Sequence, residues 1–206
     1  MVGVKPGVRL LALGGVVGPL TFVATWAIAG TTMPGYSAVD NAISDLAAVD
    51  ASTRVAMTIG FVVFGLGVIA FGFALREALE GPAWIAAVAT GGCALAVAAT
   101  PLGGWSGDAV HGAFAGLGYT AIVALPLLAY APLVAGGRRA AAILSVLTGA
   151  VSAVCLVATT FGPAHGLWQR FGLTVADAWI VVTAGVITTT AADLRTGRGS
   201  RHGSAT

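Results

Sequence analysis

Few residues in this sequence can do acid–base or metal chemistry, and several of them gather in short segments. Asp108 and His111 are three residues apart in the segment TPLGGWSGDAVHGAFAG, so in a helix they share one face. A carboxylate beside an imidazole fixes its tautomer and raises its basicity, which suits a general base or a metal ligand. A simpler interpretation fits equally well: Asp108 caps the helix and His111 is a polar residue at the membrane interface.

A second segment, FGPAHGLWQRFGLTVADAW, contains another histidine, a cation and an acid. His165 and Arg170 precede an apolar run, and Asp177 lies inside that run. Arg170 and Asp177 are seven residues apart, hence on the same helical face and about 10 Å apart along the axis. Because an acid within an apolar span is costly and usually marks a site or a buried pair, we predict that Arg170 pairs with Asp177.

The third polar segment is TTMPGYSAVDNAISDLAAVDASTR. An S-x-x-D motif follows Pro-Gly, and apolar residues then recur at helical spacing, which predicts a short amphipathic helix over Ser37–Ala48. Its polar face would carry Asn41, Ser44 and Asp45. Two interpretations stay open: an interfacial helix with a solvated polar face, or a lid whose Ser44 and Asp45 point into a bundle.

The elements that position these residues are strongly apolar. Of 206 residues, 57% are hydrophobic and 9% charged, and the mean hydropathy is +0.93. A soluble domain carries roughly 25% charged residues, so a soluble enzyme and a nucleic-acid-binding protein are excluded. The long apolar stretches predict an all-α, polytopic membrane bundle, because each could cross a ~30 Å hydrocarbon core. The six predicted transmembrane helices are Leu10–Gly30, Val55–Leu75, Ala83–Pro101, Val110–Val134, Ala140–Phe161 and Leu173–Ala192.

The basic residues predict the orientation of this bundle. Arg54 and Arg170 fall on one side of the membrane, whereas the other side holds Lys5, Arg9, Arg76, Arg138, Arg139, Arg195, Arg198 and Arg201. The positive-inside rule therefore predicts a multi-pass cell-membrane protein with both termini cytoplasmic and the three polar segments at the outer face. Residues 1–195 would form a single membrane domain, and the Gly/Ser/Arg-rich residues 196–206 a disordered cytoplasmic tail.

The composition of the predicted spans bears on transport activity and on helix packing. No charged residue or histidine is predicted near the midplane of any span, which argues against a pump or an ion-coupled transporter. Glycines in the stretches VGPL, IGF, FGLGV and FGF predict close helix packing. Cys93 and Cys155 lie in apolar runs without CxxC spacing and are interpreted as reduced core residues.

Three pieces of the polar segments resemble a known family. They are Tyr36 with the AISDLA stretch, the DAVHG stretch that begins at Asp108, and the HGLWQR stretch that begins at His165. Together with the six-span layout they resemble the bacterial and archaeal membrane proteins of domain-of-unknown-function family 998, over the whole chain except the tail. The resemblance implies an architecture and the position of a site, but no reaction.

A looser similarity links the chain to the alkaline ceramidase and adiponectin-receptor superfamily. Those integral membrane hydrolases hold zinc near one face with a Ser, an Asp and three His. Ser44, Asp45, His111 and His165 match part of that set, whereas the third histidine and the H-x-x-x-H spacing are absent. The similarity implies zinc as the metal that His111 and His165 would hold.

These observations predict one polar pocket at the outer face that binds a lipid headgroup or a small polar ligand, with membrane lipids as partners. The alternative is a membrane-embedded lipid hydrolase or transferase, with or without a metal. A haem protein fits less well, because haem-binding bundles usually place histidine within spans and His165 is predicted in a loop. The predicted catalytic side chains are Asp45, Asp108 (orienting His111), His111 (base or metal ligand) and His165 (acid or metal ligand). The predicted binding side chains are Asn41, Ser44, Asp177 and Arg170, the last as a clamp for phosphate or carboxylate.

Overall fold

All regular elements in the described part of the chain are helices. The computed structural model of the protein describes the backbone of residues 6–196 and the side chains of residues 6–189. In chain order the elements are α1 (Pro6–Thr32), the 3-10 helix η1 (Ile43–Ala47), α2 (Arg54–Ala78), α3 (Ala83–Ala99), α4 (Asp108–Leu128), α5 (Tyr130–Ala135), α6 (Arg139–Phe161) and α7 (His165–Thr196). The prediction of an all-α fold is confirmed, and the predicted tail lies outside the described residues.

Five segments are long and apolar enough to cross a membrane. They are Pro6–Thr32, Arg54–Ala78, Asp108–Ala135, Arg139–Phe161 and His165–Thr189. Helix α3 is equally apolar but has only 17 residues. The chain is therefore a multi-pass helical membrane protein, whereas the count of six spans and the orientation stay predictions.

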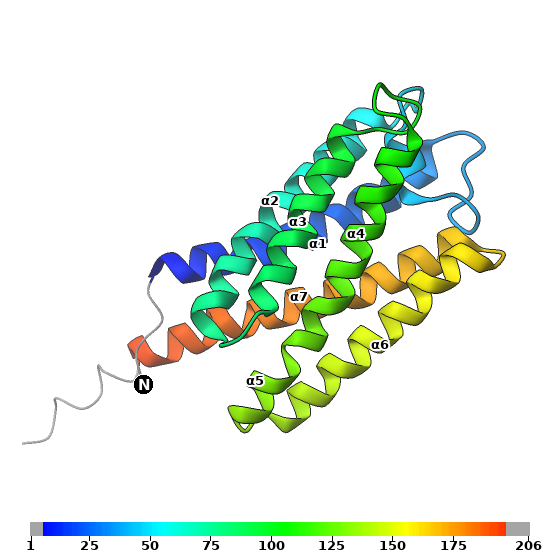
Figure 1. Ribbon diagram of the computed structural model, residues 1–206. Coiled ribbons are helices and arrows are strands. Elements are labelled where there is room, and N and C mark those ends of the chain that lie inside the picture. The colour runs from blue at the N-terminus through cyan, green and yellow to red at the C-terminus, as the bar shows by residue number, and fades with distance from the viewer. Residues whose placement is uncertain (1–5, 197–206) are drawn as a thin grey trace, which may run out of the picture.

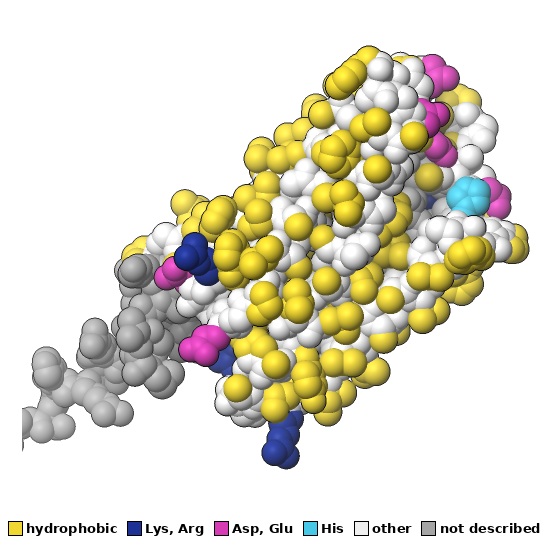
Figure 2. Space-filling view, in the orientation of Figure 1, with side chains coloured by type: hydrophobic (Ala, Val, Ile, Leu, Met, Phe, Trp, Pro, Cys, Tyr) yellow, Lys and Arg dark blue, Asp and Glu magenta, His cyan; other side chains and the backbone are white. Residues whose placement is uncertain are grey.

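The long helices pack in the order in which they occur along the chain. Each of α1 to α4 contacts the next, α4 contacts α6, α6 contacts α7, and α7 packs back against α1 (Figure 1). Short links make consecutive helices antiparallel, so every second connection lies at the same end. Figure 1 shows residues 33–53, 100–107 and 162–164 together at one end of the bundle, here called the loop end. Figure 2 shows a broad hydrophobic surface along the bundle, with charged side chains near its two ends.

Glycines let α1, α2 and α3 approach closely, as the sequence predicted. A Cβ atom on Gly14 would lie 2.5 Å from the carbonyl oxygen of Gly67, and one on Gly91 would lie 2.4 Å from the carbonyl oxygen of Gly65. Backbone atoms cannot yield at these distances, so both crossings require glycine.

The connection between α1 and α2 differs from the prediction. The predicted helix over Ser37–Ala48 is wrong in extent: the only helical turn here is η1, which begins at Ile43. Ala42 adopts an extended conformation (φ −68°, ψ 155°), and the S-x-x-D motif instead closes a local turn before it. The turn and η1 still pack on the bundle, because Ile43 and Leu46 are buried against it.

The predicted orientation of the bundle in the membrane can be tested directly. Reporter fusions at Gly136, in the link between α5 and α6, and at Gly104, at the loop end, should report opposite sides of the membrane, cytoplasm and exterior respectively. The reason is the concentration of basic residues at the end opposite the loop end. If both fusions report the same side, the six-span topology is wrong.

Candidate functional site

A cavity lies beneath η1 at the loop end, between α1, α2, α3, α4 and α7. Its volume is about 70 Å³, which leaves room for about five water molecules at 10–15 Å³ each. The lining is mainly aromatic and aliphatic, with a few polar groups that come from η1, α3, α4 and α7. The residues that line it are Phe22, Ile43, Ser44, Phe61, Phe64, Thr90, Cys93, Ala94, Val97, His111, Phe114, Ala115, Gly118, Tyr119, Ile122, Gln169 and Leu173.

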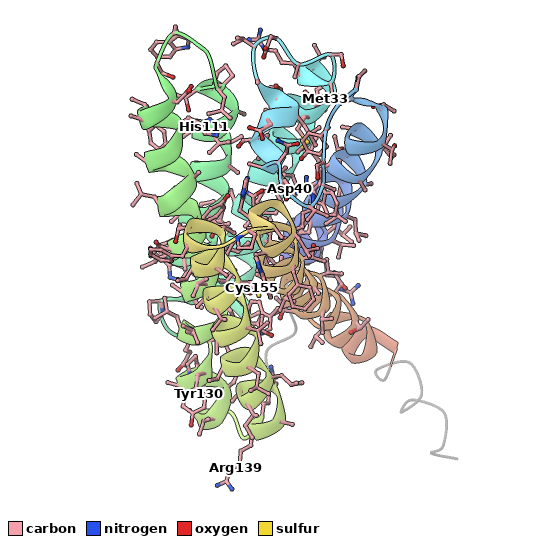
Figure 3. The ribbon with its side chains drawn as sticks, turned by 90° about the vertical axis from the view of Figure 1, so that its right-hand side faces the viewer. Met33, Asp40, His111, Tyr130, Arg139 and Cys155 are labelled. Carbon is pink, nitrogen blue, oxygen red and sulfur yellow. The ribbon has the colours of Figure 1, made fainter. Side chains whose placement is uncertain are left out.

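His111 has an unused hydrogen-bonding atom in this loop-end cavity. Its side chain is 4% exposed, and its Nδ1 lies 2.6 Å from the carbonyl oxygen of Thr100, which follows α3. Because a carbonyl oxygen only accepts, Nδ1 carries the proton and Nε2 of the neutral ring is an acceptor. Nε2 is buried and has no hydrogen-bond partner among the described residues. In Figure 3, His111 lies between the helices near the loop end.

Two further polar residues of the cavity are joined to the loop above it. The Ile43 N–H donates to Gln169 Oε1 over 2.8 Å, and Gln169 Nε2 donates to the Tyr119 hydroxyl. The hydroxyl oxygen of Tyr119 thus already accepts a bond, and its own proton can be donated into the cavity. Tyr119 was not among the site residues predicted from the sequence. The available signal was its spacing, since it lies eight residues after His111 on α4, on nearly the same face.

Arg170 holds the loop of residues 33–53 against α7. Its Nη1 donates to the carbonyl oxygens of Ala38 (2.8 Å), Asn41 (2.9 Å) and Gly166 (2.9 Å). A Cβ atom on Gly166 would lie 2.2 Å from the Asn41 oxygen, so glycine is required where the loop meets α7. Arg170 is 6% exposed, and this burial makes it a structural clamp for the loop.

Aromatic rings complete the surroundings of this guanidinium. Its Nη2 donates to the Tyr36 hydroxyl, and its Cζ lies 5.3 Å from the ring centroid of Trp26 on α1. Burial raises the pKa of Tyr36, and this effect outweighs the Arg170 charge, which lowers it. The Tyr36 phenol therefore keeps its proton at neutral pH and donates it to the carbonyl oxygen of Ala42 over 2.8 Å.

The predicted ion pair between Arg170 and Asp177 does not form. Arg170 is engaged by loop carbonyls, and both Asp177 oxygens lack a hydrogen-bond partner among the described residues. Helix α7 begins at His165, eight residues before the predicted start of the span at Leu173. Asp177 lies within the apolar segment His165–Thr189 of this helix. Its depth in the membrane stays a prediction.

The other predicted residues have separate local contacts. Asp108 is exposed, and its Oδ1 accepts from the Gly103 N–H over 2.8 Å, so Thr100 and not Asp108 orients His111. Asp45 accepts from the Ala42 N–H over 2.9 Å and caps η1.

Asn41 and Ser44 take different positions relative to the cavity. Asn41 Oδ1 accepts from the Ser37 N–H over 2.8 Å, within the loop turn. Ser44 lines the cavity together with His111, whereas His165 is exposed and does not line it. The single pocket expected from the sequence is thus divided into a buried cavity, a loop clamp and exposed residues. The functional roles of these residues stay predictions.

The donors present do not fit the zinc site that the ceramidase similarity implies. Within the described part of the chain, no group of three or more His, Cys, Asp or Glu side chains is placed to hold a metal ion. Of the two histidines predicted as ligands, His111 alone faces the cavity. We therefore derive no step through a metal.

Fold and cavity together define a multi-pass helical membrane protein with a small, mainly apolar internal cavity at its loop end. A family model described as "Protein of unknown function (DUF998)" matches residues 16–186, and the chain belongs to this family. The resemblance found from the polar segments is thereby confirmed. No curated protein and no solved structure matches the chain significantly.

Proposed function

We propose that the protein binds a lipid-like molecule that carries a hydroxyl group, with the hydroxyl donated to His111 Nε2 in the loop-end cavity. The observation that carries this proposal is the buried Nε2, which has no partner within the described part of the chain, since a buried acceptor left unpaired costs free energy that a donor recovers. An apolar cavity with a few convergent polar groups is the usual form of a small-molecule site.

The positions of the polar groups suggest how such a ligand would lie. His111 and Tyr119 both line the cavity from α4 and are about 12 Å apart along the helix axis. Between them the lining is apolar, with Phe114 and Ala115 on α4 and Phe61 on α2. A ligand hydroxyl would donate to His111, and a short apolar chain directed toward Tyr119 would contact the apolar lining. The volume of about 70 Å³ admits only this part of a lipid.

The Gln169 bridge would connect the bound molecule to the loop. Ile43 and Ser44 of η1 line the cavity, and the backbone of Ile43 is bonded to Gln169, which is bonded to Tyr119. Entry of a ligand past η1 would require the loop to move, and Arg170 is the side chain that holds this loop to α7. We therefore assign the loop of residues 33–53 the role of a lid.

A second candidate function is supported by Ser44. Its hydroxyl faces the same cavity as the His111 ring, and a serine beside an imidazole base is the combination used for nucleophilic acyl transfer. In that case the ligand would be an ester or amide of the same lipid-like class. Release of product from an ester-labelled lipid by wild-type protein, and not by Ser44→Ala, would favour this candidate over binding alone.

Binding is testable with a photoreactive long-chain alcohol as the probe. Purified protein should be labelled, and His111→Leu should weaken labelling about 5- to 150-fold, because loss of one buried hydrogen bond costs about 1–3 kcal/mol. The methyl ether of the same alcohol cannot donate a hydrogen bond and should compete poorly against the labelling.

His165→Leu is the matched control, because His165 is exposed and does not line the cavity. Its labelling should equal that of the wild type. Equal labelling of wild type and His111→Leu would contradict the proposed function.

A further inference from the structure

A second cavity lies at the end of the bundle opposite the loop end, and the proposed lipid site does not use it. Its volume is about 350 Å³, and its walls come from α2, α5, α6 and α7. Aliphatic side chains form most of these walls, such as Leu75 on α2, Leu133 on α5, Leu144 on α6 and Ile187 on α7. We call this cavity the α6–α7 groove.

The groove opens sideways, between α6 and α7, onto the hydrophobic surface of the bundle. These two helices lie close together at the loop end and farther apart at the opposite end (Figure 1, Figure 3). Leu144, Val182 and Val186 line the groove and are also exposed. Because exposed apolar side chains of a spanning helix face the hydrocarbon, a molecule could enter the groove directly from the membrane.

The two polar side chains at the inner end of the groove are already paired with each other. The Trp179 indole N–H donates to the Ser145 hydroxyl over 2.8 Å, and this hydroxyl donates to the carbonyl oxygen of Ala141 over 2.8 Å. Thr183, one turn further along α7, is the remaining neutral polar side chain of the lining. Since paired polar groups gain little from a new partner, the inner end favours an apolar chain over a headgroup.

The outer end of the groove is positively charged. Arg138 lines it at the start of α6, and Ser145 lies about 10 Å further along the helix axis. Arg138 is exposed, so a headgroup can reach its guanidinium. The first N–H groups of α6 lie here too, and the Arg138 side chain makes no capping bond to them.

No acidic side chain of the described residues lines the groove and offsets this charge. The acids nearest in the chain to its α2 wall, Glu77 and Glu80, are exposed and do not line it. A guanidinium and a helix N-terminus both attract anions, and they do so at the end of the groove from which an apolar chain could extend inward.

We propose that the α6–α7 groove binds an anionic phospholipid of the surrounding membrane. The headgroup phosphate accepts hydrogen bonds from Arg138 and from the first N–H groups of α6, and an acyl chain fills the groove as far as Trp179. A zwitterionic headgroup fits less well, because its cationic part is repelled by Arg138. In the predicted orientation this end is cytoplasmic, where basic pockets between spans are typical sites for anionic lipids. The site lies at the other end of the bundle from His111 and does not depend on the proposed function.

The test is native mass spectrometry of the full chain in detergent, titrated with phosphatidylglycerol or with phosphatidylcholine that has the same acyl chains. Wild-type protein should bind phosphatidylglycerol more tightly. Arg138→Gln should lower the affinity for phosphatidylglycerol about fivefold and remove the preference, because a basic residue near an anionic headgroup contributes about that factor.

Arg139→Gln is the matched control, because Arg139 has the same charge and does not line the groove. Figure 3 shows Arg139 at the tip of this end, directed away from the helices. Its removal should change the affinity by less than about twofold, since solvent and salt screen a charge that makes no contact. Equal affinity of the wild type for the two lipids, or equal effects of Arg138→Gln and Arg139→Gln, would overturn the proposal.

The position of the acyl chain is tested by filling the groove. Ala141→Phe places a ring inside it and should weaken the binding of both lipids, whereas Ala140→Phe should not, because Ala140 is exposed and does not line the groove. Size-exclusion profiles should show that both variants are folded. Unchanged affinity in folded Ala141→Phe would contradict the proposal. His111→Leu should bind phosphatidylglycerol as the wild type does, so failure of the loop-end site and failure of this one are distinguishable.

Discussion

Replacement of Arg170 by glutamine should release the loop of residues 33–53 from the bundle. The wild-type guanidinium donates to three carbonyl oxygens, including those of Ala38 and Asn41 in the loop, and to the Tyr36 hydroxyl. Bonds from a charged donor contribute about 1.5–3 kcal/mol each, so the free energy of local opening should fall by about 3 kcal/mol or more. Amide hydrogen exchange and limited proteolysis in this loop should accelerate by two orders of magnitude or more.

The effect should depend on the geometry of the clamp. Arg170→Lys keeps the charge but replaces a planar group that has five donors, so it should restore only part of the protection. Arg54→Gln is the matched control at the other end of the same loop, because Arg54 is exposed and its single loop contact, to the Val49 carbonyl oxygen, is 3.5 Å long. If the loop exchanges and is cleaved at the same rates in Arg170→Gln and in Arg54→Gln, Arg170 does not clamp it.

A methyl group at Gly91 should strongly destabilise the bundle. Its Cβ atom would lie 2.4 Å from the Gly65 carbonyl oxygen and 2.7 Å from Cγ1 of Ile69, both on α2. Because the nearest atom is backbone, α2 and α3 must separate, and overpacking of this kind costs about 1–3 kcal/mol or more. We expect Gly91→Ala to lower the thermal midpoint of the detergent-solubilised protein and to reduce its yield.

Gly92 offers a control on the next residue of the same helix. A Cβ atom there meets no atom within 4 Å, and alanine has a higher helix propensity than glycine by about 1 kcal/mol. Gly92→Ala should therefore leave the thermal midpoint unchanged or raise it. Similar midpoints for Gly91→Ala and Gly92→Ala would show that the close approach of α2 and α3 does not limit stability.

Substitutions in the loop clamp and in the lipid site should have different effects on probe binding. Since Ile43 and Ser44 line the cavity and belong to the loop that Arg170 holds, Arg170→Gln should change the rate of probe entry as well as loop protection. His111→Leu should change probe affinity without loosening the loop, because the hydrogen bond of His111 is to Thr100 and not to a residue of the loop. These two variants therefore distinguish the role of Arg170 in holding the lid loop from the role of His111 in binding the probe.

Much of the architecture was predictable because it depends on local composition. Apolar stretches of membrane length require helices, since only internal hydrogen bonds satisfy the backbone within lipid. Short links then place the three polar segments at one end, and small residues indicate where helices approach closely. The glycines of α2 confirm this reasoning, as Gly65 and Gly67 both lie at close crossings.

The site was only partly predictable. His111 and Ser44 were chosen from residue type and both line the cavity, but the carboxylate partner assigned to His111 was wrong, since a backbone carbonyl fills that role. Backbone carbonyls are present at every position, so no sequence signal distinguishes the one at Thr100. Tyr119 was missed for a similar reason, because its hydrogen bond to Gln169 joins residues that are 50 positions apart.

The sequence by itself determined the class of protein, the family and the end of the bundle where polar residues gather, because these follow from hydropathy and short motifs. Tertiary structure alone decided the partners of the charged residues. Arg170 and Asp177 share a helical face, yet Arg170 binds carbonyl oxygens of a loop more than 120 residues earlier in the chain. Asp177 has no hydrogen-bond partner among the residues that the structure describes. The physical reason is that a buried guanidinium takes the acceptors that packing brings within reach, and helical spacing describes only the neighbours on its own helix.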